Sequence, residues 1–212
     1  HELRSPLSAI QLRLQVLKRK YQHQPELAQD LDQIQRDVSR GTQVLENLLL
    51  LARLDPTDAV SLNKSTVSIA DLVQEVLQSL TPFIQEKAIQ IHLDVQEIQV
   101  QGNPELLFSC LRNLIDNAVR YTAPQGRIWI EAKPYELMQE ICIADNGQAV
   151  TDEVLARLGE RFYRALGSKT QGSGLGLSIC KKIIELHAGK IEFSRAEQGG
   201  LKVRILLPKA QL

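Results

Sequence analysis

The stretch that decides the fold runs from residue 103 to residue 121 and reads NPELLFSCLRNLIDNAVRY. Asn103 followed by Pro104 is a strong helix start, since asparagine caps free backbone amides and proline suits the first helical position. The pattern predicts a helix from here to about Tyr121. Asn113 and Asn117 lie four residues apart, so this helix places them on one face.

Two asparagines in the middle of a helix need a reason, because asparagine is a mediocre helix former. Amide oxygens can ligate Mg²⁺, and Arg120, which extends the same strip, could meet a phosphate. The alternative is a polar helix flank that is hydrogen-bonded within the fold. The residues of this helix alone leave both interpretations open.

The residues on either side of this helix have a mixed α/β pattern. In chain order, the patterns predict a helix over 69–80, strands over 89–95 and 98–101, strands over 127–133 and 140–144, a helix over 175–187, and a last strand pair between 189 and 207. Helices and strands do not alternate regularly. This favours an α+β sandwich, a sheet with helices on one face, over a Rossmann-type sheet.

A carboxylate and a glycine follow the strand predicted over 140–144. Asp145 could accept a hydrogen bond from an exocyclic amine such as that of adenine. Gly147 permits close approach of the backbone or a positive φ. A simple turn at the end of a strand explains the same residues equally well.

A glycine-rich run, GSGLGLS over residues 172–178, opens the next predicted helix. Backbone amides and the dipole at such a helix start favour an anion. The run is neither a Walker loop, since it lacks GK[ST], nor a Rossmann fingerprint, since its glycine spacing is wrong. The segment 150–171 before it shows little periodicity and is typical of a lid. Lys169 in that segment could reach phosphates or could be a solvated side chain.

Apolar residues recur every three or four positions at the start of the chain. The first stripe consists of Leu3, Leu7, Ile10, Leu14 and Leu17, and a second runs from Leu27 to Ala52. These heptad stripes predict a two-helix hairpin, which would bury both stripes by dimerising into a four-helix bundle. The alternative is that the hairpin packs on the rest of its own chain. Pro56 ends the second helix, and we predict domains over 1–58 and 62–212.

The chain opens with HELRSP, residues 1–6. His1 lies off the apolar stripe, so its imidazole should face solvent and could act as a nucleophile. Glu2 could orient the ring or accept its proton. Ser5 lies one helical turn from His1, on the same side. An exposed polar helix surface without a function is the alternative for these residues.

The composition gives no reason to expect nucleic acid or an anionic membrane as a partner. Lys and Arg number 25, as do Asp and Glu, so the net charge is zero and favours neither nucleic acid nor an anionic membrane. The three cysteines lack metal-type spacing and fit reduced thiols in a cytosolic compartment. No apolar run is long enough to span a bilayer. Because the chain begins at His1 and not at a methionine, we expect it to be part of a longer protein.

In this order and spacing, the motifs resemble those of bacterial sensor histidine kinases over essentially the whole chain. They resemble the family's boxes as follows: 1–6 the H box, 113–121 the N box, 145–147 the G1 box, 161–163 the F box and 172–176 the G2 box. The segment 159–179 is most like the polymyxin-resistance and quorum-sensing sensor kinases. The resemblance implies a dimeric histidine-phosphotransfer hairpin, then a Bergerat (GHKL) ATP-binding domain.

The resemblance also implies roles for single residues. His1 would be the phosphoacceptor, Glu2 its base, and Glu2 with Ser5 would assist dephosphorylation of the regulator. Asn113 would ligate Mg²⁺, and Asp145 would read the adenine amine. The full nucleotide-binding set would be Asn113, Asn117, Arg120, Tyr121, Asp145, Gly147, Lys169, Gly172, Gly174, Leu175 and Gly176.

The implied cofactors are ATP and Mg²⁺, and the implied partners are a second copy of the chain and the receiver domain of a response regulator. Nucleic acid is not expected. The family resemblance places the chain on the cytoplasmic side of an inner-membrane sensor protein.

The sequence departs from the family pattern at three places. Gln148 and Ala149 fill positions where the G1 box usually continues with x-Gly, and a positive φ at Ala149 would cost about 1 kcal/mol. Asn103 stands where aspartate is common. Ala188 replaces a usual glycine after His187, which we interpret as structural.

Two other functions stay open at this stage. One is a dimerisation module that binds nucleotide without phosphoryl transfer, which the altered G1 box suggests. The other is a related ATPase of the gyrase, chaperone or mismatch-repair class. Proteins of that class lack a heptad hairpin carrying HELRSP ahead of the nucleotide domain, which argues against it.

Overall fold

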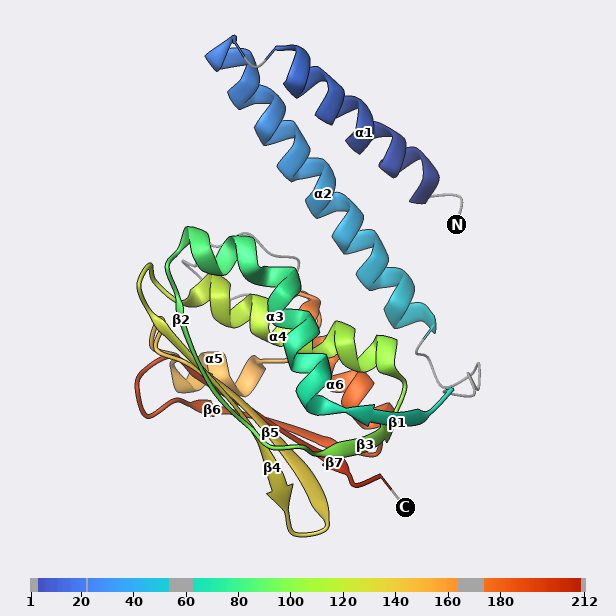
Figure 1. The fold of residues 1–212 in the computed structure, drawn as a ribbon, viewed down its shortest axis with the longest axis vertical. Coiled ribbons are helices and arrows are strands. Elements are labelled where there is room, and N and C mark those ends of the chain that lie inside the picture. Colours follow the sequence, from blue (N-terminus) through green and yellow to red (C-terminus); the bar gives the residue numbers. More distant parts are fainter. Residues whose placement is uncertain (1–3, 22, 54–62, 164–173, 211–212) are drawn as a thin grey trace. The chain divides into compact units, whose positions relative to one another are not determined.

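The computed structural model describes residues 4–21, 23–53, 63–163 and 174–210 (Figure 1). The chain divides into two compact units, His1–Ala52 and Arg53–Leu212. Each unit is built from its own set of elements and is described by itself. Among the helices of the described residues, none is both long and apolar enough to cross a membrane.

The first unit is the predicted helical hairpin. Helix α1 spans Arg4–Lys20 and helix α2 spans Pro25–Arg53, and the chain reverses between them. Leu14 and Leu31 are buried, each 7% exposed, and Lys18 forms an ion pair with Asp32 across the hairpin. Burial of one leucine from each helix is typical of a hairpin held by a narrow apolar seam.

Several apolar side chains of this hairpin are not buried between its own two helices. Ile10 on the predicted stripe is 44% exposed, and Ile34 on the second stripe is 48% exposed. Leu12 and Val16, on another side of α1, are 63% and 58% exposed. Exposed apolar surface of this kind is typical of a protein–protein interaction site.

The second unit is an α+β sandwich, as predicted. Its main sheet has five strands in the order β2-β4-β5-β7-β6. Their bounds are β2 Gln90–Val95, β4 Arg127–Tyr135, β5 Met138–Asp145, β6 Lys190–Arg195 and β7 Leu201–Pro208. Only β2 and β4 pair in parallel; β4–β5, β5–β7 and β6–β7 are antiparallel. The irregular order of helices and strands along the chain therefore gives a mixed sheet.

Three helices cover one face of this sheet: α3 Ile69–Glu86, α4 Pro104–Tyr121 and α6 Gly176–Leu186 (Figure 1). A second sheet pairs β1 Ser65–Ser68 with β3 Gln99–Gly102, and a short helix, α5, spans Asp152–Arg157. Neither β1 nor α5 was predicted. Helix α3 also continues through Pro82, past the predicted end at residue 80.

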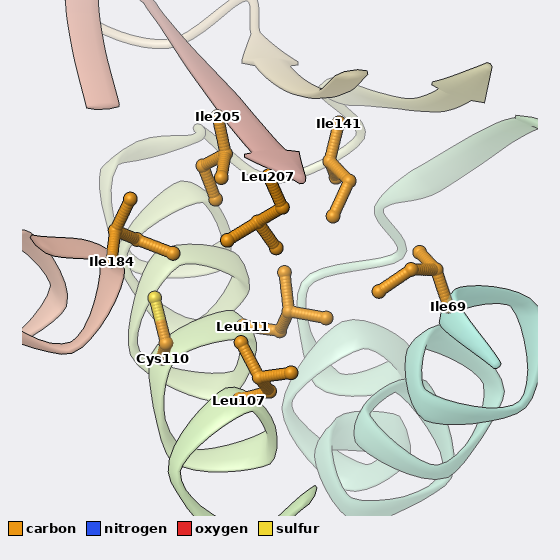
Figure 2. Close-up of a pocket in the computed structure, with 8 residues that line it drawn as sticks. All are labelled: Ile69, Leu107, Cys110, Leu111, Ile141, Ile184, Ile205 and Leu207. Atoms are coloured by element: carbon orange, nitrogen blue, oxygen red, sulfur yellow. The ribbon is translucent and has the colours of Figure 1, made fainter. Parts of the chain in front are cut away.

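The core lies between these helices and the sheet, where side chains from α3, α4, α6, β5 and β7 converge (Figure 2). Its centre is apolar and leaves no room for a water molecule, so it is packing and not a ligand site. The converging residues are Ile69, Leu107, Cys110, Leu111, Ile141, Ile184, Ile205 and Leu207. Cys110, Cys142 and Cys180 are free thiols and all are buried.

Helix α4 forms as its sequence predicts. The Asn103 side chain accepts a hydrogen bond from the amide of Leu106 at 3.0 Å, and Pro104 occupies the first turn. Its apolar face includes the fully buried Leu107, Leu114 and Ile115. Burying about three such side chains contributes roughly 5–9 kcal/mol before the entropy of ordering is subtracted. That apolar face fixes the rotation of α4 and thus the direction of its polar flank.

Candidate active site

The polar flank of α4 faces the start of α6. Nδ2 of Asn113 donates to the carbonyl of Ser109 at 2.9 Å, which turns Oδ1 away from the helix. A Cβ atom on Gly176 would lie 3.3 Å from that Oδ1 and 4.0 Å from Nδ2 of Asn117. The two asparagines and the first residue of α6 therefore share one location, as the nucleotide-site interpretation requires.

The N-terminus of α6 has features of an anion site. Its N-cap residue, Leu175, is fully buried and makes no side-chain capping bond. The amides of the first turn of a helix have no partners within the helix and carry partial positive charge. A hydrogen-bond acceptor, such as a phosphate oxygen, placed beside Asn113 and Asn117 would lie close to the backbone amides of the first turn of α6.

Arg120 is held along α4 by an ion pair. Its Nε lies 2.8 Å from Oδ2 of Asp116, one turn earlier, and both side chains are partly exposed. The neighbouring Tyr121 is 40% exposed. A phosphate bound by Arg120 would have to share the guanidinium with Asp116.

Asp145 lies at the end of β5 and is 5% exposed. Its Oδ1 accepts the amide of Gly147 at 2.9 Å, and the carboxylate also accepts the amide of Leu201. Burial raises the pKa of Asp145, and these two amides oppose the rise. A buried carboxylate with acceptor capacity left over can take a hydrogen bond from a ligand amine.

Gly147 joins this turn to the end of α4. A Cβ atom there would collide with the carbonyl oxygen of Tyr121, so only glycine allows this approach. Its φ is not positive, so close approach, and not a left-handed conformation, is what requires glycine. Asn146 links the same turn to the start of β4, because its Oδ1 accepts the amide of Arg127 at 2.7 Å. The Asp145 turn and the α4 C-terminus are one packed assembly.

The Phe162 amide donates to the carbonyl of Gly174 at 3.0 Å, and the two residues have φ angles of +63° and +71°. A Cβ atom on Gly174 would lie 2.7 Å from the carbonyl carbon of Phe162, so the backbones are in close contact. The F-box motif and the glycine run thus meet before α6. Phe162 itself is 63% exposed.

The strain that a positive φ would have caused at Ala149 does not arise, because Ala149 does not take a positive φ. Ala188 does, at φ +54°, in the position where the family usually has glycine. His187 is structural, as interpreted from the sequence. Its Nε2 accepts the Asn103 amide at 3.0 Å and its Nδ1 contacts the carbonyl of Ile183 at 2.7 Å.

Several predicted site residues lie outside the described residues: His1, Glu2, Lys169 and Gly172. Ser5 belongs to α1, but its side chain is also outside the description.

Sequence reasoning missed two residues at this site. Gly200 packs so closely on Asp145 that a Cβ atom would collide with its carboxylate. Lys87, after α3, reaches the carbonyls at the end of α4. Both contacts join residues that are far apart in the sequence, so no local sequence pattern predicts them.

Residues 102–211 match the family described as Histidine kinase-, DNA gyrase B-, and HSP90-like ATPase. Residues 1–57 match the His Kinase A (phospho-acceptor) domain. The chain belongs to the sensor histidine kinase family. The Bergerat-type sandwich and the hairpin expected from the resemblance are thereby confirmed. The ATPase domain of this family binds ATP.

Relatives at the sequence level are bacterial sensor kinases. The sensor protein QseC of Escherichia coli O157:H7 is 38% identical over 207 residues, which cover 97% of this chain and 45% of QseC. The sensor protein kinase PmrB of Pseudomonas aeruginosa is 36% identical over 213 residues, which cover all of this chain and 44% of PmrB. This histidine kinase chain therefore spans less than half the length of these relatives.

Solved structures agree with the fold. The catalytic domain of histidine kinase ThkA matches with a TM-score of 0.63 at 27% identity, covering 69% of this chain and 96% of that one. The cytoplasmic segment of histidine kinase QseC matches with a TM-score of 0.56 at 27% identity, covering 81% of this chain and 95% of that one.

Proposed function

We propose that this chain is the catalytic core of a two-component sensor kinase, which transfers the γ-phosphoryl group of ATP to His1 and then to an aspartate of a response-regulator receiver domain. The observation that carries the proposal is the meeting of the Asn113/Asn117 flank with the start of α6 at Gly176. The buried carboxylate of Asp145 joins the same assembly through Tyr121 and Gly147.

In the proposed complex, Asp145 reads the base. The exocyclic amine of adenine donates to the carboxylate, whose Oδ1 already accepts the Gly147 amide. Guanine presents a carbonyl oxygen at the same place, and two acceptors facing each other would repel. The site should therefore prefer ATP to GTP.

Asn113 fits a Mg²⁺ ligand. Its Nδ2 is engaged by Ser109, which leaves Oδ1 directed toward Gly176 as a hard oxygen donor. Asn113 would hold Mg²⁺ through this oxygen, and the ion would supply charge neutralisation to the phosphates. Asn117, Arg120, Tyr121, Lys169, Gly172, Gly174, Leu175 and Gly176 form the remainder of the proposed nucleotide-binding set.

The proposed chemistry at the hairpin is nucleophilic. A ring nitrogen of His1 forms a bond to the γ-phosphorus as the bond to the β,γ-bridging oxygen breaks and ADP leaves. Glu2 accepts the proton that the other ring nitrogen loses. In a second reaction, Glu2 and Ser5 would assist hydrolysis of the phosphorylated regulator.

We propose domain limits of 1–58 and 62–212, with a hinge near Pro56 that brings the nucleotide to His1. The exposed apolar residues of the hairpin, such as Ile10 and Ile34, support a homodimer that buries them. We place this core on the cytoplasmic side of an inner-membrane sensor, with no role for nucleic acid.

Labelled ATP tests the proposal. The chain is incubated with Mg²⁺ and γ-labelled ATP, and the product is treated with acid, since phosphohistidine is acid-labile. Wild type should carry acid-labile label. His1→Gln should carry none and yet bind ATP with unchanged affinity. Label on His1→Gln would contradict the assignment of His1.

A nucleotide-switched module without transfer is the second candidate, because Gln148 and Ala149 alter the G1 box. Ala149 does not take a positive φ, so this departure from the usual G1 box does not strain the backbone in the way that a left-handed alanine would. ATP binding by the wild type without transfer of label would favour the module over the kinase.

A further inference from the structure

The ammonium group of Lys87 lies within hydrogen-bond distance of three carbonyl oxygens at the end of α4. Its Nζ lies 2.8 Å from the carbonyl oxygen of Val119, 2.8 Å from that of Arg120 and 2.9 Å from that of Thr122. The last carbonyls of a helix have no partner within the helix. Lys87 therefore completes the hydrogen bonding of the α4 C-terminus from a separate element, since it follows α3.

The chemistry of this contact suits lysine in particular. An ammonium has three donors that diverge from one atom, whereas a guanidinium presents its donors in a flat fork. Three converging carbonyls match the first geometry and not the second. A positive charge at a helix C-terminus is also favoured by the helix dipole. Because its three donors are used by three carbonyls, Lys87 stabilises the end of α4 and has no donor left for a phosphate.

The backbone around Lys87 is tied to the same region. The carbonyl of Lys87 accepts the amide of Gln125 at 2.8 Å, and the amide of Gln90 donates to Gly126 at 2.9 Å. The turn between α4 and β4 is thus held from the α3 side by both the side chain and the backbone.

The other side of this turn is the proposed base pocket. Arg120 and Thr122, two of the residues that Lys87 holds, flank Tyr121. The carbonyl of Tyr121 packs on Gly147, whose amide donates to Asp145 at 2.9 Å. A displacement of the α4 end would be passed toward the Asp145 carboxylate through the close contact between Tyr121 and Gly147, because no side chain lies between these backbones to absorb it.

We propose that Lys87 is a positioning residue for adenine recognition: it holds the end of α4 against the Asp145–Gly147 turn and so sets the place of the carboxylate that reads the base. This inference rests on the proposed nucleotide function. It predicts an effect on base selectivity that a contribution to stability alone would not produce.

The test uses the whole chain with three variants. Lys87→Met keeps an unbranched side chain of similar length but removes the donors. Lys87→Arg keeps the charge and changes the donor geometry. Lys133→Met is the matched control, because Lys133 is a half-exposed lysine on β4 whose partners are Glu131 and Glu140. Calorimetry gives Kd for ATP and for GTP with Mg²⁺, and thermal unfolding of each variant is recorded alongside.

We expect Lys87→Met to raise Kd for ATP by about fivefold, which lies within the roughly 2- to 30-fold range for a coupling residue that does not touch the ligand. Kd for GTP should change much less, since guanine gains nothing from the carboxylate. The preference for ATP over GTP therefore falls. Lys87→Arg should lie between wild type and Lys87→Met, and Lys133→Met should match wild type.

The outcomes distinguish a failure of the proposed nucleotide function from a failure of the proposed role of Lys87. A wild type that binds no ATP removes the proposed function itself. A wild type that binds ATP, with a Lys87→Met variant that melts earlier but keeps the wild-type Kd and base preference, overturns only the positioning role. Should Lys87→Met fail to fold, the same criterion applies to Lys87→Arg.

Discussion

Replacing the Asp145 carboxylate by an amide should separate binding from stability. Asp145 is 5% exposed and accepts the amides of Gly147 and Leu201. Asp145→Asn preserves the shape and one acceptor oxygen but removes the charge. In the proposed complex it also sets an amide donor beside the adenine amine, which is a donor too.

The magnitude follows from the kind of hydrogen bond that is lost. A hydrogen bond to a charged group contributes about 1.5–3 kcal/mol net, against about 1 kcal/mol for a neutral pair. The difference of roughly 0.5–2 kcal/mol corresponds to a Kd for ATP that rises roughly 2- to 30-fold.

Although Asp145→Asn should weaken ATP binding, it should not reduce the stability of the nucleotide-free protein. Burial raises the pKa of Asp145, so the native state holds this proton to a higher pH than the unfolded state does. The stability linked to this group is present at low pH and is lost as pH rises through the folded pKa. At neutral pH the ionised, buried carboxylate therefore destabilises the fold. Asp145→Asn should not lower the melting temperature at pH 7.

Calorimetry with Mg²⁺ and ATP, together with melting curves with and without ATP, checks both parts. Wild type should gain melting temperature on adding ATP, and the variant should gain much less. An ATP affinity within twofold of wild type would refute the role of Asp145 in base recognition. A variant that melts well below wild type at pH 7 would refute the electrostatic argument.

Four further changes test other parts of the structure. Asn113→Ala should weaken Mg²⁺-dependent ATP binding about tenfold, since a metal ligand is lost; the same affinity with and without Mg²⁺ in wild type would contradict this. Ala188→Gly should stabilise the chain by about 0.5–1 kcal/mol in denaturant unfolding, because it relieves a positive φ. Burial lowers the pKa of His187, so wild type should lose stability as pH falls below about 6.5, and His187→Gln should show a smaller loss. Ile34→Glu should shift the chain from dimer to monomer in sedimentation, because it places a charge on the exposed apolar surface of α2.

Elements with strong local signals were predictable, and short or polar ones were not. Helix α4 carries a cap, a proline and an apolar period, and its predicted bounds agree with Pro104–Tyr121. Strand β1 has only four residues, STVS, and α5 only six, so neither is long enough to show a period. Helix α3 outlasts its predicted end because Pro82 is accommodated inside the helix, contrary to its usual effect.

The candidate site divides in the same way. Asn113, Asn117 and Asp145 were proposed from spacing and from position at the end of a strand, which are local features, and the structure brings the two asparagines together at the start of α6. Lys87 was not proposed, because its carbonyl partners lie 32 to 35 residues away and depend on how α3 packs on α4. Gly200 was missed for the same reason, since its close contact with Asp145 joins β7 to β5.

Helix α4 is fixed at both of its ends by side chains from other elements. At its start, His187 at the end of α6 accepts the amide of Asn103. At its end, the ammonium group of Lys87, which follows α3, donates hydrogen bonds to three backbone carbonyls. Asn113 and Asn117 lie between these two anchors, so their positions are set without any contribution from a ligand. If these two amides face the nucleotide, as proposed, a rigid helix that carries them lowers the ordering cost of binding. On the proposed function, conformational change during the cycle is then expected between the two units of the chain and not within α4.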